Sequence, residues 1–157
     1  MSRQSDRERR SAIPEENAVV VRCFYEGMNA HDLSAANLFA EDVVHHNPLP
    51  GSPPGREGNK RTMQAIFAAF PDWSVEVEDV LARGDKVAVR TVQRGTHEGE
   101  LFGIAPTGRH VEFSAMAVYR LEGGLIAEEW IETDRLELLA QLRVIDLPWT
   151  TSGAASR

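Results

Sequence analysis

The chain has 157 residues, of which 42% are hydrophobic, and its formal net charge at pH 7 is −7. This length suits a single domain, and this apolar content is enough for a core, which excludes a wholly disordered chain. The negative charge repels nucleic acid, and the absence of any long apolar run argues against a membrane partner. The single cysteine, Cys23, excludes an internal disulfide and a CxxC site, so we expect a cytoplasmic protein.

The first part of the chain has the patterns of helices. We predict a disordered arm over residues 1–13 and a helix that begins at Pro14, because proline fits a first helical turn and two glutamates follow it. Apolar residues then recur every four positions, as on one face of a helix: Val20, Phe24 and Met28. Asp32 can cap a second, short helix that carries Leu33, Ala36 and Phe39.

A proline-rich stretch separates these helices from a third one. Residues 47–55 contain four prolines, which forbid a helix or a central strand, so we predict a stiff loop there. A helix follows from about Glu57 until Pro71 forces a stop. Its apolar side chains share one face: Met63, Ile66, Phe67 and Phe70.

After Pro71 the apolar period changes to two, which indicates strands. The predicted strands are residues 73–78, Lys86–Gly95, Val111–Leu121 and Leu125–Thr133, with a glycine-rich crossing over residues 95–109. Asp134 and Glu137 have the spacing of a capping box for a last helix with Leu136, Leu139 and Leu142 inside. Helices followed by an antiparallel sheet predict an α+β fold, a cone that can hold a ligand.

Four stretches resemble the SnoaL-like polyketide cyclase family, which has the NTF2-like α+β barrel fold. They read FYEGMNAHDLSAANLFAEDVVHHNPLPGSPPGREGNK, AAFPDWSVEVEDVLARGDKVAVR, GTHEGELFGIAPTGR and VYRLEGGLIAEEWIETDRLELLAQL. The resemblance covers roughly residues 16–143. With the element boundaries above, we predict one SnoaL-like domain over residues 14–147 and a loose tail over residues 148–157. The founding chemistry of the family is a cofactor-free intramolecular aldol closure of aromatic polyketides, and other members are assigned to hydroxylation of anthracycline precursors in antibiotic biosynthesis.

The resemblance also shows two departures. In the cyclases a catalytic aspartate lies three residues before the aspartate that matches Asp134, and Ile131 occupies that position here. The assisting histidine of the cyclases falls on Ala117. Aldol closure needs a base that takes a proton next to a carbonyl and an acid that returns it, and neither side chain can do this. The resemblance thus implies a retained fold that lacks the cyclase acid–base pair.

Four residues are candidates for catalysis. His46 lies where the family places a polar side chain at the pocket, so it either contacts substrate or caps local backbone, whereas we expect His45 to be exposed. His97 either polarises a substrate carbonyl or fixes the glycine-rich crossing. Glu129 shares strand parity with Ile131, so we expect both to face the cavity, where apolar surroundings would raise a carboxyl pKa.

The fourth candidate, Arg90, lies within an apolar strand, where an arginine needs a partner. It either clamps an enolate or phenolate oxygen, pairs with a carboxylate such as Glu129, or faces outward at an interface. Large and apolar residues that would line the substrate pocket, or else pack in the core, are Trp73, Phe102, Ala117, Tyr119 and Ile131.

The leading hypothesis is a hydroxylase-like enzyme that tailors an apolar aromatic polyketide without a cofactor or metal, with a reductase as an optional partner. One alternative is a true cyclase whose acid and base come from other positions. The second is a small-molecule-binding module without catalysis. Relatives commonly pair through the outer sheet face, so the resemblance implies a homodimer, with Met116 and Val118 as candidate contacts.

Overall fold

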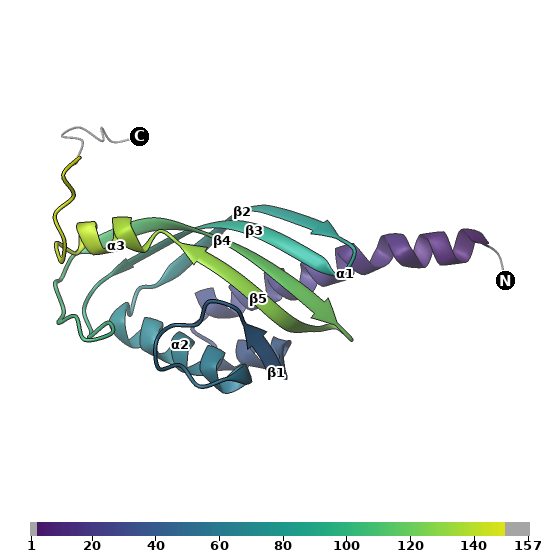
Figure 1. Ribbon diagram of the computed structural model, residues 1–157, viewed down its shortest axis with the longest axis horizontal. Coiled ribbons are helices and arrows are strands. Elements are labelled where there is room, and N and C mark those ends of the chain that lie inside the picture. Colours follow the sequence, from purple (N-terminus) through teal and green to yellow (C-terminus); the bar gives the residue numbers. More distant parts are fainter. Residues whose placement is uncertain (1–2, 150–157) are drawn as a thin grey trace.

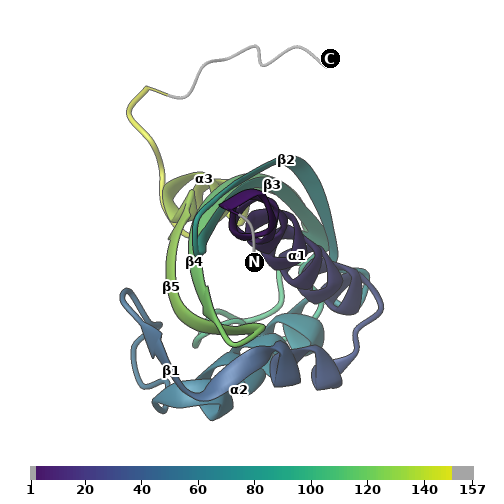
Figure 2. The same ribbon diagram turned by 90° about the vertical axis from the view of Figure 1, so that its right-hand side faces the viewer.

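Helices precede strands along the chain in the computed structural model, which describes residues 3–149, with side chains from Pro14 on. The elements are α1 (Arg3–Asn29), η1 (Leu33–Leu38), β1 (Phe39–His45), α2 (Gly55–Ala69), β2 (Ser74–Arg83), β3 (Lys86–Thr96), β4 (His110–Glu122), β5 (Leu125–Thr133) and α3 (Arg135–Gln141). The strands form one sheet in the order β1-β5-β4-β3-β2, in which β1 is parallel to β5 and the other neighbours are antiparallel. The sheet is curved, and α1 and α2 cover its concave side (Figures 1 and 2). This arrangement confirms the predicted α+β cone.

The sheet has a buried and an exposed face because its strands alternate inward and outward side chains. The alternation is most regular in β4, where every second residue is buried and the residues between are exposed or half-buried. The buried set is Val111, Phe113, Ala115, Ala117, Tyr119 and Leu121. All of these side chains except Ala115 belong to one apolar core, together with residues of α1 and α2.

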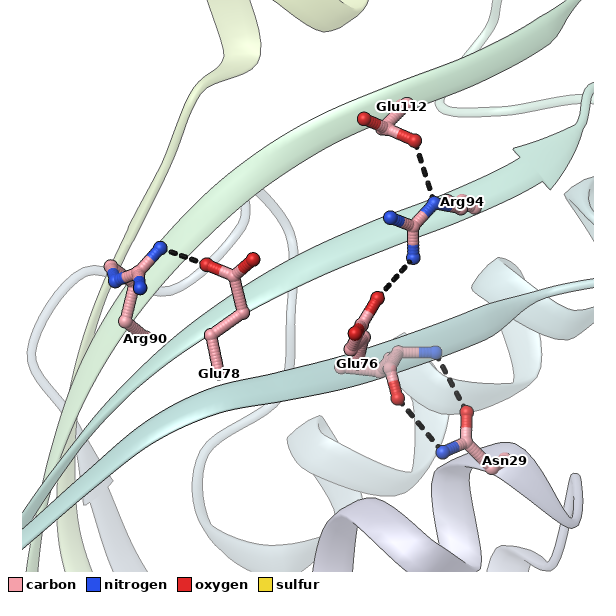
Figure 3. Close-up of polar contacts among 7 residues, drawn as sticks. Asn29, Glu76, Glu78, Arg90, Arg94 and Glu112 are labelled. Atoms are coloured by element: carbon pink, nitrogen blue, oxygen red, sulfur yellow. Dashed lines mark hydrogen bonds and ion pairs between the residues drawn. The ribbon is translucent and has the colours of Figure 1, made fainter. Parts of the chain in front are cut away.

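One asparagine joins α1 to the edge strand β2. The side-chain amide of Asn29 donates to the carbonyl oxygen of Val75 over 2.8 Å, and its Oδ1 accepts from the Val75 N–H over 2.7 Å (Figure 3). The amide thus makes both hydrogen bonds that a neighbouring strand would make at this residue. The end of α1 is therefore fixed against the sheet, next to the cavity described below.

Two glycines let the end of α2 approach the sheet closely. A Cβ atom on Gly95 would lie 2.9 Å from the Cβ of Phe70, and one on Gly99 would lie 2.1 Å from the carbonyl oxygen of Ala68. The N–H of Gly99 also donates to the carbonyl of Ala69. The predicted glycine-rich crossing is thus attached to the C-terminal end of α2.

The first helix begins earlier than predicted. It runs from Arg3 through Pro14, so the predicted arm is helical over residues 3–13. Four of these eleven residues are arginine, a good helix former, and the packed turns after Pro14 hold a helix that has lost one hydrogen bond there. Residues 1–2 and 150–157 lie outside the described residues. Among the helices of the described part, none is long and apolar enough to cross a membrane.

The prediction missed β1. Its sequence, FAEDVVH, does not alternate apolar and polar residues, and its register against β5 shifts between Phe39 and Val44. A parallel edge strand with a shifted register does not produce the regular period that identifies a strand. The short helix before it is confirmed as a 3-10 helix, in which the Asp32 side chain accepts a hydrogen bond from the N–H of Ser34. It ends at Leu38, so Phe39, predicted to lie on this helix, instead begins β1.

For the last helix, the predicted N-cap is confirmed, but the predicted set of buried residues is only partly correct. The Asp134 side chain accepts from the N–H of Glu137 over 3.0 Å, and Leu142 is buried as predicted. Leu136, predicted to lie inside, is 48% exposed. Leu138, and not Leu136, packs against the core, and Leu139, also predicted to lie inside, is half-buried.

Candidate functional site

An apolar cavity of about 330 Å³ lies between the concave face of the sheet and the helices α1 and α2. Strand β4 contributes four alternate residues to its wall: Phe113, Ala115, Ala117 and Tyr119. The two alanines are small, so they leave space between the two aromatic side chains. Residues of the proline-rich loop, of the glycine-rich crossing and of α3 complete the lining. The volume is within the range of small-molecule sites.

A histidine and a glutamate form a polar pair in this wall. His45 lies opposite Glu129 in the β1–β5 register, and its Nδ1 is 2.5 Å from Glu129 Oε1. Its Nε2 is 3.0 Å from the carbonyl oxygen of Gly55. A carbonyl oxygen only accepts, so Nε2 carries a hydrogen and donates it, which leaves Nδ1 to share a proton with Glu129. The hydrogen bond to Glu129 raises the pKa of His45 above 6.5, although burial opposes this.

Gly55 holds its carbonyl toward His45 in a conformation that other residues rarely adopt. Its φ angle is +68°, and a Cβ atom there would lie 2.3 Å from the carbonyl oxygen of Glu41. Both facts require glycine at the start of α2. The backbone therefore fixes which His45 nitrogen faces the glutamate.

Unpartnered polar atoms concentrate around this cavity. Within residues 14–149, four buried side-chain polar atoms have no hydrogen-bond partner: Glu129 Oε2, Asn59 Oδ1, Trp73 Nε1 and His97 Nε2. The first three belong to residues that line the cavity. Leaving such an atom without a partner costs about 1–3 kcal/mol, so native structures keep few of them without a functional reason.

Two tyrosines lie next to the pair. The hydroxyl groups of Tyr25 and Tyr119 are 2.7 Å apart, and both residues line the cavity. Burial raises the pKa of both hydroxyls, and the nearby charge of Glu129 adds to the effect. Both side chains are therefore neutral hydrogen-bond donors.

The structure brings six of the predicted site residues to the cavity. Glu129 and Ile131 both line it, as their shared strand parity predicted. The other four of the six were also predicted to line the substrate pocket, and they do line the cavity: Trp73, Phe102, Ala117 and Tyr119. The positions that match the cyclase aspartate and histidine therefore face the cavity with apolar side chains.

The prediction for the two histidines is wrong in both parts. His46, predicted at the pocket, lies outside it: its ring stacks on Trp130 at 4.2 Å, and its Nε2 is 2.8 Å from Glu128 Oε2. His45, predicted to be exposed, is the residue that lines the cavity. The two exchange places because the shifted β1 register turns His45 inward.

Arg90 is not a clamp in the cavity. It lies on the outer face of the sheet, where it pairs with Glu78 (Figure 3) and, over 2.8 Å, with Asp79. Its neighbours Val89 and Thr91 are buried, so strand parity turns Arg90 outward. Of the alternatives weighed from the sequence, the structure shows an outward position and a carboxylate pair, with Glu78 and Asp79 in place of Glu129.

His97 does not line the cavity either. It is fully buried, and its Nδ1 accepts a hydrogen bond from the N–H of Thr107 over 3.3 Å. Its backbone N–H donates to Arg109, and its carbonyl accepts from Gly108. Burial lowers its pKa. His97 thus fixes the glycine-rich crossing, which was the structural alternative for this residue.

The sequence analysis missed His45, Tyr25 and Asn59 at the cavity. Tyr25 could have been found, because Val21, Tyr25 and Met28 have helical spacing and widen the predicted apolar stripe of α1. Asn59 carries no such signal. No group of three or more histidine, cysteine or acidic side chains suited to a metal ion occurs in the described residues.

The comparisons with known proteins agree with this geometry. The family model described as SnoaL-like polyketide cyclase matches residues 18–142. The solved structure of IdmH from Streptomyces antibioticus, named a "putative polyketide cyclase", is 38% identical, with 81% of this chain and 98% of that chain covered and a TM-score of 0.70. AclR from Streptomyces galilaeus, named a "putative hydroxylase", is 27% identical, with coverages of 85% and 99% and a TM-score of 0.75. A "putative polyketide cyclase" from Bacillus cereus is 28% identical, covers 83% of each chain and has a TM-score of 0.73. No curated protein matches.

Proposed function

Because the chain belongs to the SnoaL-like polyketide cyclase family, we propose that it closes a ring in an apolar aromatic polyketide by cofactor-free proton transfer. The observation that carries this proposal is the His45–Glu129 pair in the wall of an apolar cavity. Ile131 and Ala117 remove the acid and base expected from the cyclases, and this pair supplies both functions from other positions. Because this pair can replace the missing cyclase residues, ring closure is a stronger proposal than hydroxylation.

In the proposed reaction, Glu129 is the base and His45 is its positioning partner. The Glu129 carboxylate takes a proton from the carbon next to a substrate carbonyl, and the resulting enolate carbon attacks a second carbonyl carbon of the same molecule. A carbon–carbon bond forms, and the new alkoxide takes the proton back from Glu129. His45, held by Gly55, keeps the carboxylate oriented and balances its charge.

Hydroxylation is the second candidate, and one observation favours it. AclR is 27% identical and is named a "putative hydroxylase", and the present cavity has apolar residues at the two cyclase positions. The first step would be the same: Glu129 takes a proton from an electron-rich ring. The anion would then add dioxygen to give a hydroperoxide on the ring. Two electrons and two protons from a partner reductase would cleave its O–O bond, so that one oxygen atom stays as a hydroxyl and the other leaves as water.

Product mass separates these candidates. We would incubate the purified protein with the methyl ester of an uncyclised tricyclic polyketide, under nitrogen and under air, with and without a reductase. Ring closure under nitrogen, giving a product of unchanged mass, supports the cyclase. Addition of one oxygen atom only under air supports the hydroxylase. Recovery of the unchanged ester in every mixture, with binding retained, would leave only the non-catalytic binding module.

The homodimer expected from the resemblance is part of the proposal. Met116 is 61% exposed on the outer face of β4, and Val118 beside it is half-buried. A Met116→Glu substitution would introduce a charge there without touching the cavity. We expect it to lower the mass measured by light scattering to that of one chain.

A further inference from the structure

Tyr25 and Tyr119 form a hydroxyl pair that the proposed reaction has not yet used. Tyr25 lies on α1 and Tyr119 on β4, and their oxygens meet at 2.7 Å although 94 positions separate them in the chain. Tyr119 is directly opposite Glu129 in the β4–β5 register. The pair therefore lies beside the proposed base, in the wall of the same cavity.

The two hydroxyl groups carry two hydrogens, and the hydrogen bond between them uses only one. A tyrosine hydroxyl carries one hydrogen and can accept others. The two hydroxyls make one hydrogen bond with each other, and neither makes another within the described residues. One O–H hydrogen is therefore left without a partner at the wall of the cavity.

Burial indicates which tyrosine keeps that hydrogen. Tyr119 is 0% exposed and is surrounded by aromatic rings, including those of Phe24 and Phe39. Its only hydrogen-bond partner among the described residues is the oxygen of Tyr25, so we assign Tyr119 as the donor of this bond. Tyr25 is 8% exposed and retains its own hydrogen for the cavity. Accepting a hydrogen bond also polarises the Tyr25 hydroxyl and makes it a stronger donor.

We propose that Tyr25 donates a hydrogen bond to the substrate oxygen that becomes negative when Glu129 takes the proton, and that Tyr119 positions Tyr25. This inference rests on the proposed proton transfer. Removing a proton next to a carbonyl moves negative charge onto the carbonyl oxygen, and a donor fixed in a cavity without water stabilises that charge. The cavity would thus favour substrates whose reacting carbonyl reaches the Tyr25 hydroxyl, such as aryl ketones and 1,3-diketones.

Two small probes test the donor without knowledge of the natural substrate. 2-Acetylnaphthalene carries a carbonyl, and 2-isopropenylnaphthalene has nearly the same shape with a CH₂ group in place of the oxygen. Dissociation constants would be measured by calorimetry for the unchanged protein and for Tyr25→Phe, Tyr119→Phe and Glu129→Gln. The carbonyl stretching frequency of the bound ketone would be recorded in parallel, because a donated hydrogen bond lowers it.

We expect the unchanged protein to prefer the ketone by about three- to tenfold, the range of one neutral hydrogen bond. Tyr25→Phe should lose this preference and the lowered stretching frequency while it binds the hydrocarbon equally well. Tyr119→Phe should keep part of both, because the donor remains but is less well held. No preference in the unchanged protein, or a full preference in Tyr25→Phe, would overturn the inference.

Turnover separates this inference from the proposed function. Glu129→Gln should abolish ring closure yet keep the ketone preference, because the donor is intact. Tyr25→Phe and Tyr119→Phe should lower kcat by a larger factor than they raise KM, since the hydrogen bond strengthens as charge develops. If Glu129→Gln closes the ring normally, the proposed function fails even when the probes confirm the donor. Should Tyr25→Phe not fold, an unchanged ketone preference and kcat in Tyr119→Phe would contradict the assignment.

Discussion

His45 and His46 are consecutive residues of the chain, as are Glu128 and Glu129, and they form two His–Glu pairs on opposite faces of the sheet. In the inner pair, His45 and Glu129 are 2.5 Å apart, and their side chains are 10% and 9% exposed. In the outer pair, His46 and Glu128 are 2.8 Å apart, with exposures of 37% and 24%. The alternation of neighbouring strand residues produces this contrast.

The surroundings of the two pairs differ more than their geometry. Glu128 also accepts a hydrogen bond from Arg120, and His46 stacks on Trp130, so the outer pair is complete without a ligand. Glu129 keeps a buried oxygen without a partner and lies at the cavity. We infer that the pair with an unsatisfied atom performs chemistry, whereas the satisfied pair holds the sheet together.

The outer pair is one of several ion pairs on the convex face. Arg94 lies between Glu76 and Glu112, at 2.9 and 2.6 Å (Figure 3). Each such arginine joins neighbouring strands through exposed carboxylates, and exposed pairs contribute little to stability one by one. The convex face thus tolerates substitution, and this makes it a source of matched controls for the cavity.

The largest expected difference between the pairs is in activity. Glu129→Gln removes the proposed base and should lower kcat by about 10²–10⁴-fold, the usual contribution of a general base. Glu128→Gln makes the same change one residue away and should leave kcat within about twofold. Steady-state kinetics of ring closure would measure both. Equal losses in the two variants would show that the inner pair has no special role.

The next effect is on stability. His45→Ala leaves the Glu129 carboxylate in an apolar wall without its partner, which should lower the free energy of unfolding by about 3 kcal/mol. His46→Ala removes a half-exposed contact, and the effect should be clearly smaller. Urea unfolding followed by circular dichroism would compare the two. A loss in His46→Ala as large as that in His45→Ala would contradict the contrast between inner and outer pairs.

Part of this site could be predicted from the sequence because β4 and β5 alternate regularly. The parity that places Glu129 and Ile131 on one face also places Ala117 and Tyr119 at the cavity, and the structure confirms it. Strand alternation alone could also have predicted that Arg90 points outward, because its neighbours Val89 and Thr91 are both buried. In strands that alternate regularly, the order of residues along the strand is enough to predict which side chains face the cavity.

The rest depends on contacts between distant parts of the chain. His45 meets a partner 84 positions away, through a parallel strand whose register shifts and whose sequence does not alternate. Tyr25 depends on Tyr119, 94 positions away. The residues around His45 and Tyr25 in the sequence do not predict that their partners are Glu129 and Tyr119. The error at His45 and His46 followed directly from the unrecognised strand, because a shift of one residue exchanges the two faces.

The two pairs should also respond to opposite ends of the pH range, and the inner pair gives the larger response. Glu129 raises the pKa of His45 above 6.5, so the folded protein binds the proton more tightly than the unfolded chain does. The stabilisation is complete below pH 6.5 and is lost as pH rises through the higher folded pKa. We expect the free energy of unfolding to fall above pH 6.5, and Glu129→Gln to flatten this part of the profile. An unchanged alkaline slope in that variant would exclude Glu129 as the cause.

The smallest expected effect is on the acid side and belongs to the outer pair. Hydrogen bonds from His46 and Arg120 lower the pKa of Glu128 below 4.5, so its stabilisation is present above that pH and is lost as pH falls through the lower folded pKa. Glu128→Gln should therefore flatten the acid limb of the same profile while leaving the alkaline limb unchanged. Because the pair is exposed, the difference should shrink further in 1 M salt, which screens such contacts. If the substitution leaves the acid limb unchanged at low salt, His46 and Arg120 do not stabilise the ionised Glu128 carboxylate more than water does.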